Sequence, residues 1–433
     1  MGNTKELRPL GTNGGGIMRK SILLRAPVLT RSGYGEQSRF ALRALRSRED
    51  LFDVYIQPLQ WGQTSWINEE SEERLWIDDK IEKTIAYVNG GGQFDLSLQV
   101  TIPNEWEFLA AKNIGYTAGI ETTRVAHEWI QKGNNMDKII VVSEHSKNIY
   151  EKSSYEATYE NSDESFNLQL TTDINSVNYP VKTYENMEAL NLELEYDFNF
   201  VTVAQMGPRK NLHNTIKWFV EEFKNDEVGL VVKTNVSKNS QIDREIVHGQ
   251  LLSLLASIPD TEDRKCKIYM IHGDMTDEEM HQMYLHPKIR AAVSLTHGEG
   301  FGLPLFEAAY MDVPVVATGW SGQLDFLCDE NGDRNFYDVS YDLQPVPEQT
   351  VWDGVIVKDS MWAYPREISA RQQMRTCYED IANGTEPFAG YADKLKERFE
   401  EGKMLAAFVE AMGVEEEFDV ESWLDDLDIE EVE

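Results

Sequence analysis

The chain has 433 residues, with 41 lysines and arginines against 75 aspartates and glutamates, and its formal net charge is -34. This length exceeds one typical hydrophobic core, so two domains are expected. The negative charge argues against a nucleic-acid backbone as the main partner, because such a partner needs a basic face. Three widely separated cysteines without a CxxC pair indicate neither disulfides nor a zinc site, and they fit a reducing, cytoplasmic setting.

The two ends of the chain differ in composition from the rest. Residues 1–17 are polar and glycine-rich, which predicts a flexible leader without the pattern of an export signal. Nowhere is there a run of about 18 apolar residues, so no segment is expected to cross a bilayer. Residues 413–433 are acidic and contain no lysine or arginine. They predict a solubilising tail, or alternatively one that binds a protein partner.

Alternating strand and helix patterns predict an α/β N-terminal domain over residues 18–182. Its strands are expected at residues 21–25, 53–56, 94–100, 114–117 and 138–142. A loop with Gly33 and Gly35 follows the first strand and precedes a helical pattern, so N–H groups at the helix start could bind an anion. A purely structural turn explains these two glycines about equally well.

Two further features of this half have more than one interpretation. The helix after the glycine loop carries Arg39, Arg43 and Arg46. They predict either weak contact with an anionic membrane or, more simply, a solvated face beside acidic neighbours. Residues 151–178 are rich in Ser, Thr, Asn and Glu, which predicts a loop or hairpin insertion.

A second domain is expected over residues 183–375. The loop MGPRKN follows its first strand and contains Arg209 and Lys210, and a later buried strand ends in Lys233. Another strand ends just before Gly273. Open α/β sheets bind ligands at the carboxyl ends of their strands, and cations at that edge suit phosphate groups.

The most informative stretch runs from Thr296 to Leu327 and reads THGEGFGLPLFEAAYMDVPVVATGWSGQLDFL. An apolar strand, a glycine loop and a helix starting at Pro304 follow one another, so unpaired N–H groups and the positive end of the helix dipole face one spot. Glu299 in the loop and Glu307 in the first helical turn can reach the same pocket. In an ordinary α/β turn, Glu307 would only complement the helix dipole.

The spacing of Glu299 and Glu307, with GFGLP between them and a PVVAT strand after them, closely resembles the signature of retaining GT-B glycosyltransferases of the GT4 family (glycosyltransferase group 1). The resemblance extends over most of the chain and implies an α/β GT-B fold, with two Rossmann-like domains facing each other across a cleft. It also implies a retaining hexosyltransferase that uses a nucleoside-diphosphate sugar and an acceptor hydroxyl. Neither a metal nor another cofactor is expected.

The resemblance assigns roles to individual residues. Glu299 would lie beside the sugar, while Arg209 and Lys210 would hold the departing diphosphate, and these three are the catalytic candidates. The donor-binding candidates are Glu307 through the ribose hydroxyls, Gly300, Phe301, Gly302, Leu303, Lys233, Gly273, Gly33 and Gly35. In the first domain, Glu121 and Thr122 would lie on the acceptor side.

One departure from the family pattern bears on function. Relatives carry an arginine directly after the first strand of the second domain, where this chain has Gln205, and Arg209 is the candidate to replace it. Two alternative functions therefore stay in view. One is a nucleotide-sugar 2-epimerase of the same fold, and the other is a non-catalytic subunit that binds a nucleotide sugar or a partner enzyme.

Two last expectations concern His127 and the C-terminal part of the chain. The imidazole of His127 titrates in the range of a general base, but its place in a helical pattern favours a packing or surface role. Residues 361–381 resemble helices that cross back to the first domain. Helices are expected over residues 376–412.

Overall fold

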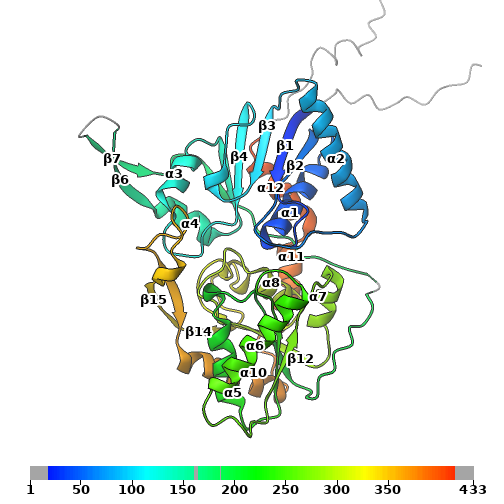
Figure 1. Ribbon diagram of the computed structural model, residues 1–433, viewed down its shortest axis with the longest axis vertical. Coiled ribbons are helices and arrows are strands. Elements are labelled where there is room, and N and C mark those ends of the chain that lie inside the picture. Colours follow the sequence, from blue (N-terminus) through cyan, green and yellow to red (C-terminus); the bar gives the residue numbers. More distant parts are fainter. Residues whose placement is uncertain (1–17, 160–163, 186, 415–433) are drawn as a thin grey trace, which may run out of the picture.

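The computed structural model describes residues 18–159, 164–185 and 187–414, and it shows two α/β domains stacked one on the other (Figure 1). The first domain runs from blue to cyan, and the second from green to orange. The leader predicted for residues 1–17 and the acidic tail from residue 415 lie outside the described residues. Two Rossmann-like domains are therefore confirmed.

The first domain is built on a parallel six-stranded sheet with the order β2-β1-β3-β4-β5-β8. The strands are β1 (Lys20–Ala26), β2 (Phe52–Pro58), β3 (Leu96–Val100), β4 (Lys112–Thr117), β5 (Lys138–Val141) and β8 (Ile174–Ser176). The helices are α1 (Gly33–Arg46), α2 (Glu72–Asn89), η1 (Pro103–Glu105), α3 (His127–Gly133) and α4 (Glu144–Lys152). Helices cover both faces of this sheet (Figure 1), so β3 and β4 are almost entirely buried, although they carry polar residues such as Gln99 and Asn113.

The insertion predicted over residues 151–178 contains a hairpin of β6 (Ser154–Thr158) and β7 (Ser165–Gln169), which projects from the domain (Figure 1). Strand β8 lies in the same stretch but pairs with β5 in the main sheet. The polar composition of the stretch conceals this short strand, whose three residues are too few to give an apolar run.

The second domain repeats the parallel arrangement with the order β11-β10-β9-β12-β13-β14. Its strands are β9 (Asn199–Val203), β10 (Gly229–Lys233), β11 (Lys267–Ile271), β12 (Ile289–Ser294), β13 (Val315–Thr318) and β14 (Tyr337–Val339). Its helices are η2 (Pro208–Lys210), α5 (Leu212–Phe223), α6 (Gln241–Ser257), α7 (Asp277–Tyr284), α8 (Leu303–Tyr310), α9 (Leu324–Leu327) and α10 (Glu367–Ala382). The loops that carry the sequence motifs follow the carboxyl ends of β9, β10, β11 and β12.

The segment after β14 differs from the sequence expectation. Residues 361–365 are not helical but form β16 (Met361–Pro365), which pairs antiparallel with β15 (Tyr341–Pro345). Helix α10 packs on α5 and β14 of its own domain. The element that crosses back is α12 (Glu401–Ala411), which follows α11 (Tyr391–Arg398) and packs on α1.

The excursion between β15 and β16, which includes η3 (Glu348–Thr350), reaches the first domain. The Asn104 side chain donates to the carbonyl of Gly354 at 2.9 Å, and the Met361 N–H donates to the Thr123 hydroxyl at 3.0 Å. An apolar core also continues across the interface, because Tyr179 in the linker packs on Phe40 of α1 at 5.8 Å and on Phe301 at 5.2 Å between ring centroids. The two domains are thus held together by both polar and apolar contacts.

Candidate active site

The glycine loop after β12 presses against the first domain. A Cβ atom on Gly300 would lie 2.5 Å from the carbonyl oxygen of Ala118, which closely follows β4. Gly302 has φ 101° and caps α8, a left-handed conformation that suits glycine. Pro304 stands in the first turn of that helix. The loop therefore needs glycine both to turn into α8 and to approach the other domain.

The buried Glu299 forms an ion cluster with two partly exposed cations from the loop after β9. The Lys210 Nζ atom lies 2.7 Å from both carboxylate oxygens of Glu299, and Arg209 Nη1 lies 3.1 Å from one of them. Burial opposes ionisation of Glu299, but the charges of Lys210 and Arg209 outweigh it and lower its pKa to about 2. The residues predicted to be catalytic are thus in direct contact, and Glu299 is an anion at neutral pH.

Arg209 joins the two domains within this cluster. Its Nη2 atom lies 3.1 Å from Glu121 of the first domain, and Nη1 also donates to the carbonyl of Gly298 at 2.6 Å. Burial would lower the pKa of Arg209, but Glu121 and Glu299 raise it. Glu121 therefore faces the cluster. Thr122 instead is buried, and its hydroxyl donates to the carbonyl of Arg124 at 2.9 Å.

Lys233 and Gly273 form a second polar group along the same edge of the sheet. Lys233 ends β10, and its Nζ donates to the carbonyl of Gly273, just beyond β11, at 2.7 Å. Burial lowers the pKa of Lys233, and Asp274 opposes this effect only in part. The lysine predicted for phosphate contact is thus held by a neutral carbonyl, which leaves its positive charge available to an anion.

Glu307 has different electrostatic surroundings from Glu299. Burial raises its pKa to about 8, because the opposing charge of Lys182 is offset by Asp277 and Glu36. Glu307 would therefore be largely protonated at neutral pH in the ligand-free protein. The sequence pattern places both glutamates in one pocket. In the structure, Glu299 contacts two cations, whereas Lys182 acts on Glu307 only through its charge and has two acidic partners of its own.

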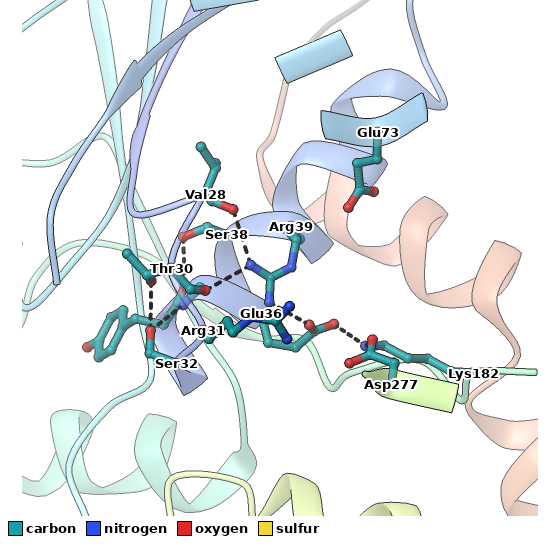
Figure 2. Close-up of polar contacts among 12 residues, drawn as sticks. Val28, Thr30, Arg31, Ser32, Glu36, Ser38, Arg39, Glu73, Lys182 and Asp277 are labelled. Atoms are coloured by element: carbon teal, nitrogen blue, oxygen red, sulfur yellow. Dashed lines mark hydrogen bonds and ion pairs between the residues drawn. The ribbon is translucent and has the colours of Figure 1, made fainter. Parts of the chain in front are cut away.

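The start of α1 lies close to Lys182 and Asp277, two of the residues whose charges act on Glu307 (Figure 2). Ser32 caps the helix by accepting from the N–H of Gly35 at 2.9 Å, and a Cβ on Gly35 would lie 1.9 Å from the carbonyl oxygen of Thr30. A Cβ on Gly33 would meet nothing within 4 Å. Gly35 thus has a structural role in this turn, whereas Gly33 leaves open space at the helix start.

Lys182 is the residue of this region that sequence reasoning missed. Its Nζ lies 2.6 Å from Glu36 and 2.8 Å from Asp277, and the side chain is 18% exposed (Figure 2). Its only signal in the sequence is a lone lysine at the end of the linker NYPVK, where local pattern does not indicate a partner.

The basic helix face of α1 is occupied by ion pairs. Arg39 lies 3.1 Å from Glu36, Arg43 lies 2.7 Å from Glu73, and Arg46 lies 2.5 Å from Glu72. Within the described part of the chain, no helix is long and apolar enough to cross a membrane. Membrane contact through these arginines stays a prediction, and it would have to compete with these glutamates.

The remaining candidates take the following places. The Phe301 side chain is 3% exposed in the core, so its backbone is the part available to a donor, and Leu303 begins α8. Gln205 donates to the carbonyl of Val236 at 2.6 Å. His127 is exposed and lies 3.1 Å from Glu128. Among the described residues, no group of three or more His, Cys, Asp or Glu side chains could hold a metal ion.

Known proteins resemble this chain in part of its sequence and in its fold. No protein-family model matches it. A stretch of 135 residues, 30% of the chain, is 30% identical to the serotype-specific mannosyltransferase WbdA of Escherichia coli, of which it spans 15%.

The likeness in three dimensions covers much more of the chain. Alr3699/HepE of Anabaena, solved with UDP and glucose, has a TM-score of 0.56 and 12% identity. The match covers 91% of this chain and 100% of the HepE chain. Sucrose-phosphate synthase of Thermosynechococcus elongatus matches 91% over 98% of its own chain, with a TM-score of 0.57 and 12% identity. At such identity the likeness concerns the fold alone. The chain has the GT-B fold that the sequence predicts.

Proposed function

We propose that the chain is a glycosyltransferase that moves a sugar from a nucleoside-diphosphate sugar to an acceptor hydroxyl. The observation that carries this proposal is the ion cluster of the buried Glu299 with Arg209 and Lys210 at the carboxyl ends of β9 and β12, in contact with Glu121 of the other domain. Open α/β sheets bind ligands at this edge. The relatives named as a mannosyltransferase and as a complex with UDP and glucose support the same class of reaction.

The chemistry of sugar transfer suits this cluster. A diphosphate accumulates negative charge as the glycosidic bond breaks, so Arg209 and Lys210 would stabilise the transition state more than the bound donor. The anomeric carbon becomes electron-poor at the same time. Glu299 would place its fixed negative charge beside that carbon, because its low pKa keeps it ionised over the working range of the enzyme.

The other donor contacts follow from the family resemblance. Glu307 would accept hydrogen bonds from the ribose hydroxyls, and the backbone N–H groups of residues 300–303 would face the sugar and diphosphate. Lys233, Gly273 and Gly33 would complete the donor site. Arg209 would take the role of the family arginine, since it contacts Glu299 while Gln205 is bonded to Val236.

We infer a retaining hexosyltransferase of the GT4 type that acts without a metal. The leaving phosphate would help to deprotonate the acceptor on the same face of the sugar, which keeps the anomeric configuration. Activity in EDTA should therefore equal activity with added Mg²⁺. The anomeric configuration of the new glycoside, assigned from its one-bond C1–H1 coupling in NMR, should match that of the donor.

The direct test is a panel of UDP-, GDP-, ADP- and dTDP-sugars, scored by thermal shift and by slow hydrolysis of the donor. One nucleotide sugar should raise the melting temperature, and Arg209→Ala should abolish the shift. Lys217→Ala is the matched control, because Lys217 pairs only weakly with Glu221 on α5, at 3.8 Å. The absence of stabilisation by all four would contradict the donor site, and an epimerised nucleotide sugar would support the epimerase instead.

A further inference from the structure

The loop after β2, residues 59–71, brings a tryptophan beside the glycine loop of the first domain. Its backbone runs along the loop after β1, since the N–H of Arg31 donates to the carbonyl of Ser65 and the N–H of Ile67 to that of Leu29, both at 2.8 Å. The ring of Trp61 packs on Tyr34, with 4.1 Å between centroids and 32° between planes. Trp61 stays partly exposed. Tyr34 thus supports an indole ring that solvent can still reach.

Tyr34 connects this ring to the candidate active site. Its hydroxyl lies 2.8 Å from the Thr117 hydroxyl and accepts from the N–H of Ala118 at 3.3 Å. Ala118 is also the residue whose carbonyl leaves no room for a side chain at Gly300. Trp61 is therefore linked through two residues to the loop that carries Glu299. It belongs to the domain that does not supply the diphosphate cations.

Two carboxylates act on Tyr34 electrostatically. Burial raises the pKa of its phenol, and the negative charges of Glu121 and Glu105 raise it further. Each has a cation nearby, since Arg209 lies 3.1 Å from Glu121 and Arg25 Nη1 donates to the backbone carbonyl of Glu105 at 2.8 Å. A carboxylate in an ion pair still has lone pairs that accept from hydroxyl groups, which suits a neutral ligand with several hydroxyls.

We propose that Trp61, supported by Tyr34, is the platform on which a pyranose ring of the acceptor stacks, so that the acceptor is itself a carbohydrate. A pyranose presents one face of C–H groups, which an aromatic ring contacts through its negatively polarised face. Its rim of hydroxyls suits carboxylates such as Glu105 and Glu121. This inference rests on the proposed function, since it names the acceptor class of that site.

The test uses the full chain with the donor that it hydrolyses. Acceptors are the methyl glycosides of glucose, galactose, mannose and N-acetylglucosamine, with glycerol, a serine peptide and a polyprenyl phosphate as non-sugar probes. At least one glycoside should accept the sugar. Trp61→Ala should raise the KM for that glycoside about tenfold or more, whereas donor KM and donor hydrolysis should change less than about twofold. Trp61→Phe should restore most of the affinity.

Trp76→Ala is the matched control. Trp76 is also a partly buried tryptophan of the first domain. Its indole N–H donates to Glu49 at 3.2 Å, and Glu49 precedes β2, so Trp76 lies at the amino ends of the strands, away from the site. The acceptor KM of the Trp76→Ala variant should stay at the wild-type value. An equal change in Trp61→Ala and Trp76→Ala, or a change confined to donor KM, would overturn the role of Trp61.

The carbohydrate acceptor has its own decisive outcomes. Donor hydrolysis without transfer to any glycoside, or transfer only to a non-sugar probe, would overturn it and leave the proposed function intact. A chain that neither binds nor hydrolyses any nucleotide sugar would contradict the proposed function itself, and the acceptor proposal would fall with it.

Discussion

The Nζ atom of Lys182 lies 2.6 Å from a carboxylate oxygen of Glu36, and this ion pair joins the interdomain linker to α1. The same Nζ lies 2.8 Å from Asp277 at the start of α7. One lysine thus binds an acidic residue from each domain. Burial opposes ionisation of Glu36, but Lys182, Arg39 and Arg43 outweigh it and lower its pKa. The pair is therefore charged at neutral pH and helps to fix the relative position of the two domains.

Removing Lys182 should destabilise the protein. Lys182→Met leaves Asp277, whose side chain is 53% exposed, without this cation, while Glu36 keeps Arg39 and Arg43. We therefore expect a cost of about 1–3 kcal/mol. Chemical denaturation at pH 7 would measure this cost. Lys217→Met, which removes the weak pair with Glu221 on α5, should cost less than about 1 kcal/mol.

The effect of Lys182→Met should also depend on pH. Because the pKa of Glu36 is lowered from 4.5 in the folded state, its contribution is present above about pH 4.5 and is lost as the pH falls below it. The difference between wild type and variant should therefore shrink in acid. Equal stabilities of Lys182→Met and Lys217→Met at pH 7 would show that the pair does not hold the domains.

The sequence predicted those parts of the molecule that local pattern determines. The strand, glycine loop and helix around Glu299 were predicted correctly, because apolar runs and turn residues specify them within about thirty residues. The placement of Arg209 and Glu299 in one donor site followed only from family resemblance, and their direct ion pair, across 90 positions, was not predicted. Lys182, with partners at 36 and 277, gave no local signal. Its role appears only when the two domains pack.

The paired strands β15 and β16 and the crossing helix α12 show the same limit. Family resemblance predicts helices over residues 361–381, but Pro365 separates the aromatic stretch of Trp362 and Tyr364 from α10, and that stretch forms β16. Which helix returns to the first domain is likewise decided by tertiary contact. Phe408 of α12 packs edge-on against Phe40 and Tyr116, at 5.4 Å and 4.9 Å between centroids. A lone phenylalanine does not reveal such partners in advance.

Glu307→Gln should stabilise the protein in mild alkali. The pKa of Glu307 is raised from 4.5 to about 8, so the folded chain keeps a proton that the unfolded chain loses. Its stabilising effect is complete below about pH 4.5 and is lost as the pH rises through 8. The variant should match wild type near pH 4.5 and exceed it by about 2–4 kcal/mol at pH 9.

The same substitution tests the ribose contact. If donor binding needs the Glu307 carboxylate, wild-type donor affinity should rise as the pH increases towards 8, because less proton must be released. In Glu307→Gln the affinity should be lower and lose this pH dependence. Isothermal titration with the nucleoside diphosphate of the donor identified by the panel, in two buffers of different ionisation heat, would measure the released proton. A variant with wild-type affinity and proton release would contradict the assignment.

Glu299→Gln should separate catalysis from donor binding. The substitution removes the carboxylate charge that would stabilise the positive charge developing on the sugar. We therefore expect kcat to fall by about 10²–10³-fold. Affinity for the nucleoside diphosphate of the donor identified by the panel should be retained or increase, because Arg209 and Lys210 are released from the carboxylate that now binds them. Steady-state kinetics and titration with that nucleotide would check both values. Unchanged transfer would refute a catalytic role for Glu299.

Glu299 should also have a stability signature of opposite sign to that of Glu307. Its pKa is lowered from 4.5 to about 2, so its contribution is present above about pH 4.5 and is lost as the pH falls through 2. Glu299→Gln should therefore be destabilising at pH 7 and approach wild type in acid. Thermal melts of the two glutamine variants across one pH series would compare both signs directly. Parallel pH profiles would contradict the opposite surroundings of the two glutamates.

Gly300→Ala should impair catalysis by separating the two domains at the site. A Cβ at this position would lie 2.5 Å from the backbone oxygen of Ala118, so one of the two loops must shift. Such a shift displaces Glu299 from Glu121 and the acceptor side, and a misplacement of about 1 Å can cost about 10²-fold in rate. Gly207→Ala is the matched control, because Gly207 lies close to Arg209 and its Cβ would meet nothing within 4 Å. Gly300→Ala should lose transfer while binding of the nucleoside diphosphate is preserved, whereas wild-type rates in both variants would show that the loop contact is dispensable.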